Sequence, residues 1–335
     1  MLQQANIGGS MRKRYWVVLG FIGAVTGLWA WNSSLIACPS SNWILEFIAH
    51  RGLHQTFHRE GLTNQTCTAE RIFPPSHDYL ENTPESTNAA IELGADIVEI
   101  DIAPTMDNKL AVFHDWTLDC RTTGTGPIRD KKMADLRYGY TADEGKTVPF
   151  RGKFVGQLYE LSEFIERVQP SDAKLLINFK SDDPEEAKLL LDYFENDPKL
   201  NQMTVAVYGG ARPVAETIAK RPDLGGYSKQ DTKACLLKYI ALGWSGHVPE
   251  ECHNKWVSVP ANIAPAMWGW PHRLTKRLAE HNSRLVLLGP MDLTDIKSGT
   301  TGIDQLEQLD YIPENFDGYI WTNRLEVLKP ALDAR

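Results

Sequence analysis

The chain has 335 residues, of which 42% are hydrophobic and 23% are charged, a composition typical of globular proteins with a large core. Its formal net charge is −8, which argues against a nucleic-acid partner, because proteins that follow a phosphate backbone usually carry a basic surface. The length would accommodate two domains. However, α/β barrels use about 250 residues as one domain, and no linker-like stretch divides residues 44–335, so we expect one catalytic domain there.

The N-terminus predicts a membrane anchor. Arg12, Lys13 and Arg14 precede an uncharged, mostly apolar run from Tyr15 to Trp31. As a helix this run spans roughly 26 Å, and continuing it toward residue 37 reaches the ~30 Å of a bilayer core. We therefore predict a transmembrane helix at 15–37. The basic residues keep 1–14 in the cytoplasm, so the catalytic domain would be extracytoplasmic, either periplasmic or extracellular.

Two other interpretations of this segment remain open. It is also compatible with a cleaved signal peptide, although it lacks a convincing A-x-A cleavage site. The stretch "SLIAC" resembles a bacterial lipoprotein box, in which Cys38 would be acylated after cleavage, and a start at Met11 would give that signal a normal length. We rank the uncleaved anchor first and the lipoprotein second.

The remaining four cysteines fit an oxidising compartment, where four cysteines allow three pairings. We expect the bonds Cys67–Cys120 and Cys235–Cys252, the second of which closes a short loop. Buried free thiols are the alternative.

After the anchor, short β-branched runs alternate with amphipathic stretches, which indicates a mainly parallel sheet, closed or doubly wound. Nine runs qualify as strands, one more than a barrel of eight needs, so one of them is expected to be an accessory or hairpin strand. The predicted strands are 44–50, 96–102, 109–115, 173–180, 203–209, 224–229, 255–262, 284–290 and 317–323. The clearest helices are 83–94, 161–169, 183–196 and 273–282.

Residues 51–80 form one long segment without strong periodicity. Long loops inside compact domains are usually functional or disordered. Because this loop contains a cysteine, paired prolines and several histidines, we predict an ordered loop over the active site.

Two acids stand out in the second strand. Glu99 and Asp101 are two residues apart, so they point to one face, while Val98 and Ile100 point to the other. Two neighbouring buried carboxylates repel each other, and a hard cation such as Ca²⁺ or Mg²⁺ removes that conflict. An exposed edge strand with solvated acids is the alternative, which the apolar neighbours disfavour.

The motifs "AHRG", "ENTPES" and "VEIDIAPTMDNKLAVFHDWTLDCRTTGTG" together resemble the glycerophosphodiester phosphodiesterase family. The resemblance implies a TIM-type (β/α)8 barrel. It also implies a divalent metal, Ca²⁺ or Mg²⁺, and general acid and base catalysis by two histidines. By position, the implied site contains His50 and His114 as the catalytic pair, Arg51 and Lys180 as phosphate ligands, and Glu81, Glu99, Asp101 and Asn178 as metal ligands.

The chain departs from the family pattern in three places. The fourth-strand motif Glu-x-Lys is Asn178-Phe179-Lys180 here, which replaces a charged metal ligand by an amide. The loop 51–80 is much longer than is typical. The "WTNR" sequence lies on the last strand, at 321–324.

We predict that the protein hydrolyses a glycerophosphodiester to glycerol 3-phosphate and an alcohol, in lipid headgroup metabolism. A phospholipase C- or D-like enzyme acting on intact lipid is one alternative, favoured by the anchor and by tryptophans in the late loops. The "IAPAMWGWPHR" stretch at 263–273 could form a lipid-facing lip or simply pack inside the barrel. A catalytically weak relative that binds phosphodiesters is the other alternative, favoured by Asn178.

Overall fold

The computed structural model describes residues 7–34, 36, 43–63, 66–139, 142–143, 155–294 and 301–334. The strands are β1 (Leu45–His50), β2 (Ile97–Pro104), β3 (Leu110–Val112), β4 (Ala142–Asp143), β5 (Val155–Gly156), β6 (Tyr159–Glu160), β7 (Lys174–Phe179), β8 (Thr204–Gly209), β9 (Gly225–Ser228), β10 (Trp256–Pro260), β11 (Arg284–Leu288) and β12 (Gly318–Thr322). The α-helices are α1 (Ile7–Asn32), α2 (Pro84–Glu92), α3 (Met133–Gly139), α4 (Leu161–Arg167), α5 (Glu185–Asn196), α6 (Pro198–Met203), α7 (Ala211–Lys220), α8 (Lys229–Leu242), α9 (His272–Ala279) and α10 (Leu325–Asp333).

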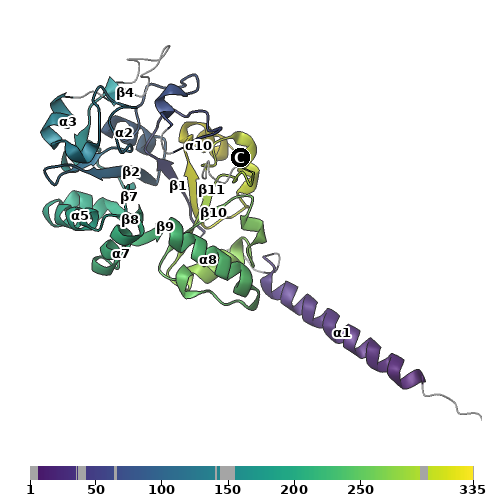
Figure 1. Cartoon of the computed structure of the whole chain (residues 1–335). Helices are drawn as coiled ribbons and strands as arrows, with labels where there is room; N and C mark the ends of the chain where they lie inside the picture. Colours follow the sequence, from purple (N-terminus) through teal and green to yellow (C-terminus); the bar gives the residue numbers. More distant parts are fainter. Residues whose placement is uncertain are drawn as a thin grey trace, which may run out of the picture.

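Eight parallel strands form a nearly closed barrel surrounded by helices (Figure 1). Their order is β10-β11-β12-β1-β2-β7-β8-β9, so the first and last strands of the barrel are hydrogen-bonded neighbours. Strands β9 and β10 stand at the two ends of this order and lie close together without a backbone ladder between them. The predicted TIM-type barrel is therefore confirmed.

Of the nine predicted strands, 109–115 is the accessory strand that lies outside the eight of the barrel. Its core, β3, pairs antiparallel with β2, with Ile102 opposite Val112. Asn108 makes the turn in the left-handed region at φ 57°, which asparagine tolerates well. The hairpin brings the chain back beside the end of β2, where the Phe113 amide donates to the Asp101 carbonyl at 3.0 Å. His114 is thereby delivered to the mouth of the barrel.

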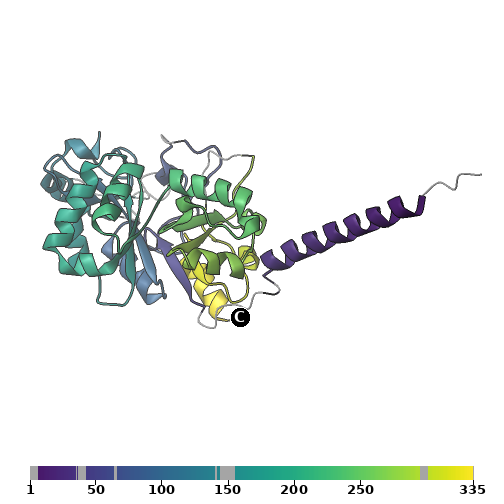
Figure 2. The ribbon, with the colours of Figure 1, turned by 90° about the horizontal axis from the view of Figure 1, so that it is seen from below.

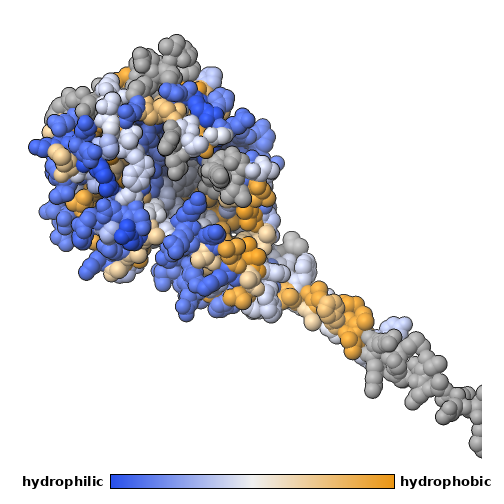
Figure 3. All heavy atoms as spheres, in the orientation of Figure 1, coloured by the Kyte–Doolittle hydropathy of each residue, from blue (hydrophilic) through white to orange (hydrophobic). Residues whose placement is uncertain are grey.

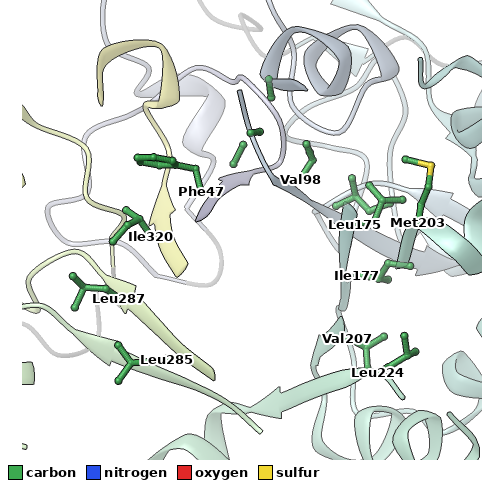
Figure 4. Packing of buried hydrophobic residues seen from close by; sticks show 14 of the residues in the cluster. Phe47, Val98, Leu175, Ile177, Met203, Val207, Leu224, Leu285, Leu287 and Ile320 are labelled. Carbon is green, nitrogen blue, oxygen red and sulfur yellow. The ribbon is translucent and has the colours of Figure 1, made fainter. Parts of the chain in front are cut away.

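Alternation along each strand separates two environments. Val98 and Ile100 belong to the large apolar cluster between the strands and the helices. Figure 4 shows other members of this cluster along neighbouring strands, including Phe47, Leu175, Ile177, Val207, Leu285, Leu287 and Ile320. Ile97 points to the opposite face of its strand and lies in a second cluster, inside the barrel. Glu99 and Asp101 continue the row of Ile97, so they line the interior at the carboxyl end, where TIM barrels build their sites.

The N-terminal helix α1 extends away from the barrel in both Figure 1 and Figure 2. Its segment Tyr15–Asn32 is long and apolar enough to cross a membrane, and of this segment only its last residue, Asn32, is buried against the protein. The predicted membrane insertion of this helix remains a prediction. Cys38, the predicted site of the lipoprotein alternative, lies outside the described residues.

Both predicted disulfides are present. Cys67 is bonded to Cys120, and Cys235 is bonded to Cys252. The first bond fastens the long loop 51–80 to the segment that follows His114. Within the described residues this loop also contains a short 3₁₀ helix, Thr68–Glu70, and a bridge between Phe57 and Ile72, so it is ordered as predicted.

Candidate active site

A buried arginine lies at the centre of the polar cluster in the barrel mouth. The backbone N–H of Arg51 donates to Glu99 Oε2 at 3.0 Å, and its Nη1 donates to Glu81 Oε2 at 3.1 Å. Its Nε lies 3.3 Å from Asp101 Oδ2. Burial opposes the charge of this guanidinium, but Glu81 and Asp101 outweigh that effect and raise the pKa of Arg51. Three of the predicted metal ligands therefore surround one cation of the protein itself.

The turn after β1 explains how Arg51 reaches this position. Arg51 has φ 59°, and Gly52 follows in the same left-handed region at φ 73°. A Cβ on Gly52 would lie 2.6 Å from Ser86 Oγ and 2.8 Å from the Ser86 carbonyl carbon. The glycine thus allows the turn to pack against the first turn of α2, where Thr83 caps the helix by accepting from the Ser86 N–H. This packing holds the preceding Glu81 beside Arg51.

Glu99 and Asp101 are fully buried, with 0% of each residue exposed. Glu99 Oε1 accepts from the Tyr208 hydroxyl at 2.6 Å, and Asp101 Oδ2 accepts from Asn82 Nδ2 at 3.0 Å. Burial and the neighbouring Asp101 raise the pKa of Glu99. Burial also acts against the charge of Asp101, but Lys180 and other positive neighbours hold its pKa well below the usual range. The pair therefore combines a charged Asp101 with a Glu99 whose charged form is disfavoured by burial and by Asp101.

Asn178 and Lys180 both reach Asp101 from β7. Asn178 Nδ2 donates to Asp101 Oδ1 at 2.7 Å, and Lys180 Nζ lies 3.4 Å from the same oxygen. The amide oxygen of Asn178 faces Gly209, whose Cβ, if present, would lie 2.5 Å away. In this arrangement Asn178 serves Asp101 as a hydrogen-bond donor, and its oxygen, the atom predicted to bind metal, is turned aside.

His50 is held at the end of β1 by the last strand. Its Nδ1 lies 2.6 Å from Asn323 Oδ1, and the Asn323 amide is fixed because Nδ2 donates to Asp304 Oδ2 at 2.8 Å. The proton therefore resides on His50 Nδ1, and Nε2 accepts from Arg51 Nε at 3.2 Å. Burial and the positive charge of Arg51 lower the pKa of His50 well below its usual value.

His114 has a similar support from a different partner. Its Nδ1 lies 2.6 Å from Asp115 Oδ1, and Asp115 Oδ2 in turn lies 3.4 Å from Arg121 Nε. Arg121 Nη1 is also 3.3 Å from Glu81 Oε2, which links the second histidine to the acidic cluster. Burial and the nearby Arg51 lower the pKa of His114.

A cleft of about 320 Å³ opens beside His50 and Arg51. Its cationic lining includes Arg59 and Arg324, which come from the long loop and the last strand end. His54, from the same long loop, also lines the cleft and is only 3% exposed. The loop folds this ring inward, edge-on to His50 at 5.6 Å between ring centroids.

The residues around Arg51 fit a divalent cation in part. Glu81, Glu99 and Asp101 offer hard oxygen donors around one small volume, and burial together with the neighbouring Asp101 raises the pKa of Glu99. In the part of the chain that the structure describes, no group of three His, Cys, Asp or Glu side chains is already arranged to hold a metal. The carboxylates are thus the fitting ligands, whereas Asn178 is not oriented as one.

All eight predicted site residues meet in this mouth, but several residues that support them were not predicted as site residues. Their direct partners are Asn82, Asp115, Arg121, Tyr208 and Asn323, and Asp304 acts through Asn323. A signal existed for four of them, because Asn82, Asp115, Arg121 and Asn323 lie inside motifs that stood out in the sequence. For Tyr208 the only signal is its place in β8, where alternation along the strand would point it inward. Asp304 lies in a loop without any sequence pattern.

The fold and the site define a barrel protein with a buried centre of acids, histidines and basic side chains at the carboxyl ends of its strands. The chain belongs to the glycerophosphoryl diester phosphodiesterase family, whose family model matches residues 50–219. That match begins at His50 and includes every predicted site residue.

Individual relatives agree with this assignment. A glycerophosphodiester phosphodiesterase of Caldanaerobacter subterraneus is 36% identical over 108 residues, which cover 30% of this chain and 40% of the relative. The chain therefore matches well under half the length of that curated relative. The glycerophosphoryl diester phosphodiesterase domain of a Mycobacterium tuberculosis protein shares the fold, with a TM-score of 0.58, 15% identity and coverage of 86% of this chain and 98% of that one. An Oleispira antarctica phosphodiesterase, solved in complex with the product sn-glycerol-3-phosphate, has a TM-score of 0.50, 16% identity and coverage of 86% and 96%.

Proposed function

We propose that the protein hydrolyses glycerophosphodiesters to glycerol 3-phosphate and an alcohol. The observation that carries the proposal is the pair of histidines, His50 and His114, each held at Nδ1 by a side-chain oxygen. This support leaves Nε2 as the basic nitrogen of each ring; at His50 that atom accepts from Arg51 Nε at 3.2 Å without substrate, and the attacking or departing oxygen would replace this contact. Family membership and the product bound to the Oleispira relative support the substrate class.

Two proton transfers complete the reaction. For direct attack by water, one histidine accepts a proton of the water at Nε2, and the other donates a proton to the oxygen of the departing alcohol. The lowered pKa values of His50 and His114 favour the neutral form that a general base needs. The negative charge of the bound phosphate raises the pKa of the ring that acts as the acid.

The phosphoryl oxygens gain charge as the bond to the nucleophile forms. Arg51 and Lys180 are the cationic side chains nearest the acidic pair, and they would neutralise that charge. A divalent metal, Ca²⁺ or Mg²⁺, would be held by Glu81, Glu99 and Asp101, and when bound it would polarise the phosphoryl group as a Lewis acid.

We also propose that α1 anchors the enzyme in a membrane, with the barrel on the extracytoplasmic side. The apolar segment Tyr15–Asn32 supports the anchor, and the two disulfides support an oxidising compartment. An anchored barrel would act at a lipid surface, which favours intact phospholipid as the second candidate substrate.

The test is a substrate panel with the full-length protein in lipid nanodiscs. Glycerophosphocholine and glycerophosphoethanolamine should release choline and ethanolamine when Ca²⁺ or Mg²⁺ is present, and chelator should stop the release. His50→Ala and Glu99→Ala should each abolish it. Release that survives both substitutions would refute the site. Turnover of diacyl phospholipid but not of soluble diesters would favour the second candidate.

A further inference from the structure

One face of helix α8 is apolar on the outside of the barrel. Leu237 is 59% exposed, Ile240 is 40% exposed, and Trp244, just beyond the helix, is 47% exposed. The spacing of three and four residues places them on one side of the helix. A surface helix normally turns polar side chains outward. Here the outward side becomes apolar toward its C-terminal end, while Cys235 and Tyr239 face the core.

One more apolar side chain extends this face. Trp268, from the loop before α9, is 36% exposed. Trp268 Nε1 donates to the Ile240 carbonyl at 2.8 Å, which fixes the indole beside the end of α8. We call these four residues the apolar face: Leu237, Ile240, Trp244 and Trp268.

The apolar face adjoins the end of α1. Asn32, the last residue of that helix, donates through Nδ2 to the Trp244 carbonyl at 2.8 Å. Ser34 Oγ donates to the Gly269 carbonyl at 2.8 Å, one residue after Trp268. Figure 3 shows hydrophobic residues gathered on the side of the domain from which α1 emerges.

A buried arginine fixes this junction. Arg277 of α9 donates through Nη1 to Asn32 Oδ1 at 3.0 Å and to the Tyr239 hydroxyl at 3.1 Å. The same group lies 3.2 Å from the Gly243 carbonyl. The guanidinium of Arg277 thus connects the end of α1, the buried side of α8 and the turn that carries Trp244. These hydrogen bonds attach α1 to the barrel at a defined point.

We infer that the apolar face is a membrane-docking surface, which rests its side chains in the interfacial region of the same bilayer that α1 crosses. The inference rests on the proposed anchor. If Tyr15–Asn32 spans the hydrocarbon core, Asn32 marks its boundary, and Trp244, hydrogen-bonded to Asn32, lies at headgroup level. Tryptophan and leucine side chains on a helix are the chemistry that partitions into this layer, and an apolar patch exposed to water would otherwise favour aggregation. The occupant is therefore lipid, and the barrel is seated on the bilayer in one orientation.

Depth-resolved fluorescence quenching tests this with the full-length protein in phosphatidylcholine nanodiscs. A fluorescent noncanonical amino acid is placed at Leu237, at Val18 in α1, or at Lys188 on α5 as the matched exposed control, whose side chain is 62% exposed. Nitroxide lipids labelled in the headgroup should quench position 237 several-fold more than position 188. Nitroxide placed deep in the acyl chains should quench position 18.

The outcomes separate the two proposals. Quenching at 18 together with equal quenching at 237 and 188 would overturn the docking surface and leave the anchor standing. Absence of quenching at both 18 and 237 would overturn both proposals. Energy transfer between labelled copies at 237, without quenching by lipid, would show a protein partner in place of lipid and would also overturn the inference. Hydrolysis of a soluble diester by the Leu237 variant should equal that of the unlabelled enzyme, because Leu237 lies outside the catalytic machinery.

Discussion

His50 Nδ1 and Asn323 Oδ1 lie 2.6 Å apart at the barrel mouth, although 273 residues separate the two residues in the chain. The first and last strands of the barrel supply them, and the parallel pairing of β1 with β12 makes them neighbours. Because Asp304 fixes the Asn323 amide, the oxygen that faces His50 is determined, and so is the position of the ring proton.

Asn323→Ala should therefore reduce kcat by about 10- to 100-fold, within the range that a correctly held acid or base contributes. The ring would lose the acceptor that keeps its proton on Nδ1, so Nε2 would be the free base in fewer molecules. The KM for a soluble diester should change little. Asn88→Ala is the matched control, because Asn88 also makes backbone hydrogen bonds but lies on α2 away from the site. Equal kcat values for both variants would contradict the role of Asn323.

Asn178→Glu should lower the stability of the protein in the absence of metal, and it should make that stability depend more strongly on added metal. The substitution removes the hydrogen bond to Asp101 and places a second negative charge against it. We expect a loss of about 2 kcal/mol in the free energy of unfolding in chelator, recovered on addition of Ca²⁺ or Mg²⁺ because the new carboxylate is a cation ligand. Urea unfolding with and without metal measures both effects.

The control for this variant is Asn196→Glu, which adds the same charge at the exposed end of α5. Its stability should not respond to metal beyond the response of the wild type. If Asn178→Glu behaves in the same way as this control, the space beside Asp101 does not bind a cation.

The two disulfides should differ in their effect on catalysis. Cys120 is adjacent to Arg121, which contacts both Glu81 and Asp115. Removing both Cys67 and Cys120 by serine substitution should cost about 4 kcal/mol by the loop-entropy estimate for residues 53 apart. It should also lower kcat, because the arginine that supports His114 loses its tether.

The Cys235→Ser/Cys252→Ser variant is the comparison. Its loop spans 17 residues, so the same estimate gives about 3 kcal/mol, with kcat unchanged at temperatures where the variant is folded. Chemical denaturation and steady-state kinetics distinguish the two cases. An equal loss of kcat in both variants would indicate general loosening of the barrel.

Acid should destabilise the protein partly through His54. Burial, ahead of nearby positive charges such as Arg51, lowers the pKa of His54 to about 3, against about 6.5 in an unfolded chain. The unfolded state therefore binds the proton first, so the stability is fully present above pH 6.5 and falls as the pH drops toward 3. Between pH 7 and pH 5 this residue alone should cost about 2 kcal/mol.

His54→Gln should reduce that pH dependence, because glutamine stays neutral in both states. The free energy of unfolding, measured at pH 7 and pH 5, gives the slope for each variant. His247→Gln is the control at an exposed histidine and should keep the wild-type slope. A wild-type slope in His54→Gln would contradict this, because it would show that His54 takes up its proton equally in the native and unfolded states.

Local periodicity was sufficient to predict part of this site. Glu99 with Asp101, and Asn178 with Lys180, share faces because side chains alternate along a strand, and the structure confirms that all four point to the barrel interior. The family motifs predicted His50 and His114. The supporting partners depend on neighbours across the sheet, so Tyr208 and Asp304 carried no signal within their own segments.

Contacts between side chains also determined orientations and partners of site residues that the motifs did not predict. Arg51 was predicted as a phosphate ligand, and the structure shows in addition that it compensates three buried carboxylates. Asn178 was predicted as a metal ligand from its place in the family motif; in the structure its amide donates to Asp101, and metal binding by its oxygen stays a prediction. The burial of His54 was not predicted, because the path of an irregular loop cannot be read from composition.

The pairing of β1 with β12 has a consequence for the order of biosynthesis. A chain emerging from the ribosome presents His50 early and Asn323 almost last, so the histidine has no acceptor at Nδ1 until the final strand is inserted between β11 and β1. The unfinished barrel therefore contains both acids and both histidines but lacks the partner that holds the ring proton of His50 on Nδ1. The proposed site is completed only when the sheet is completed.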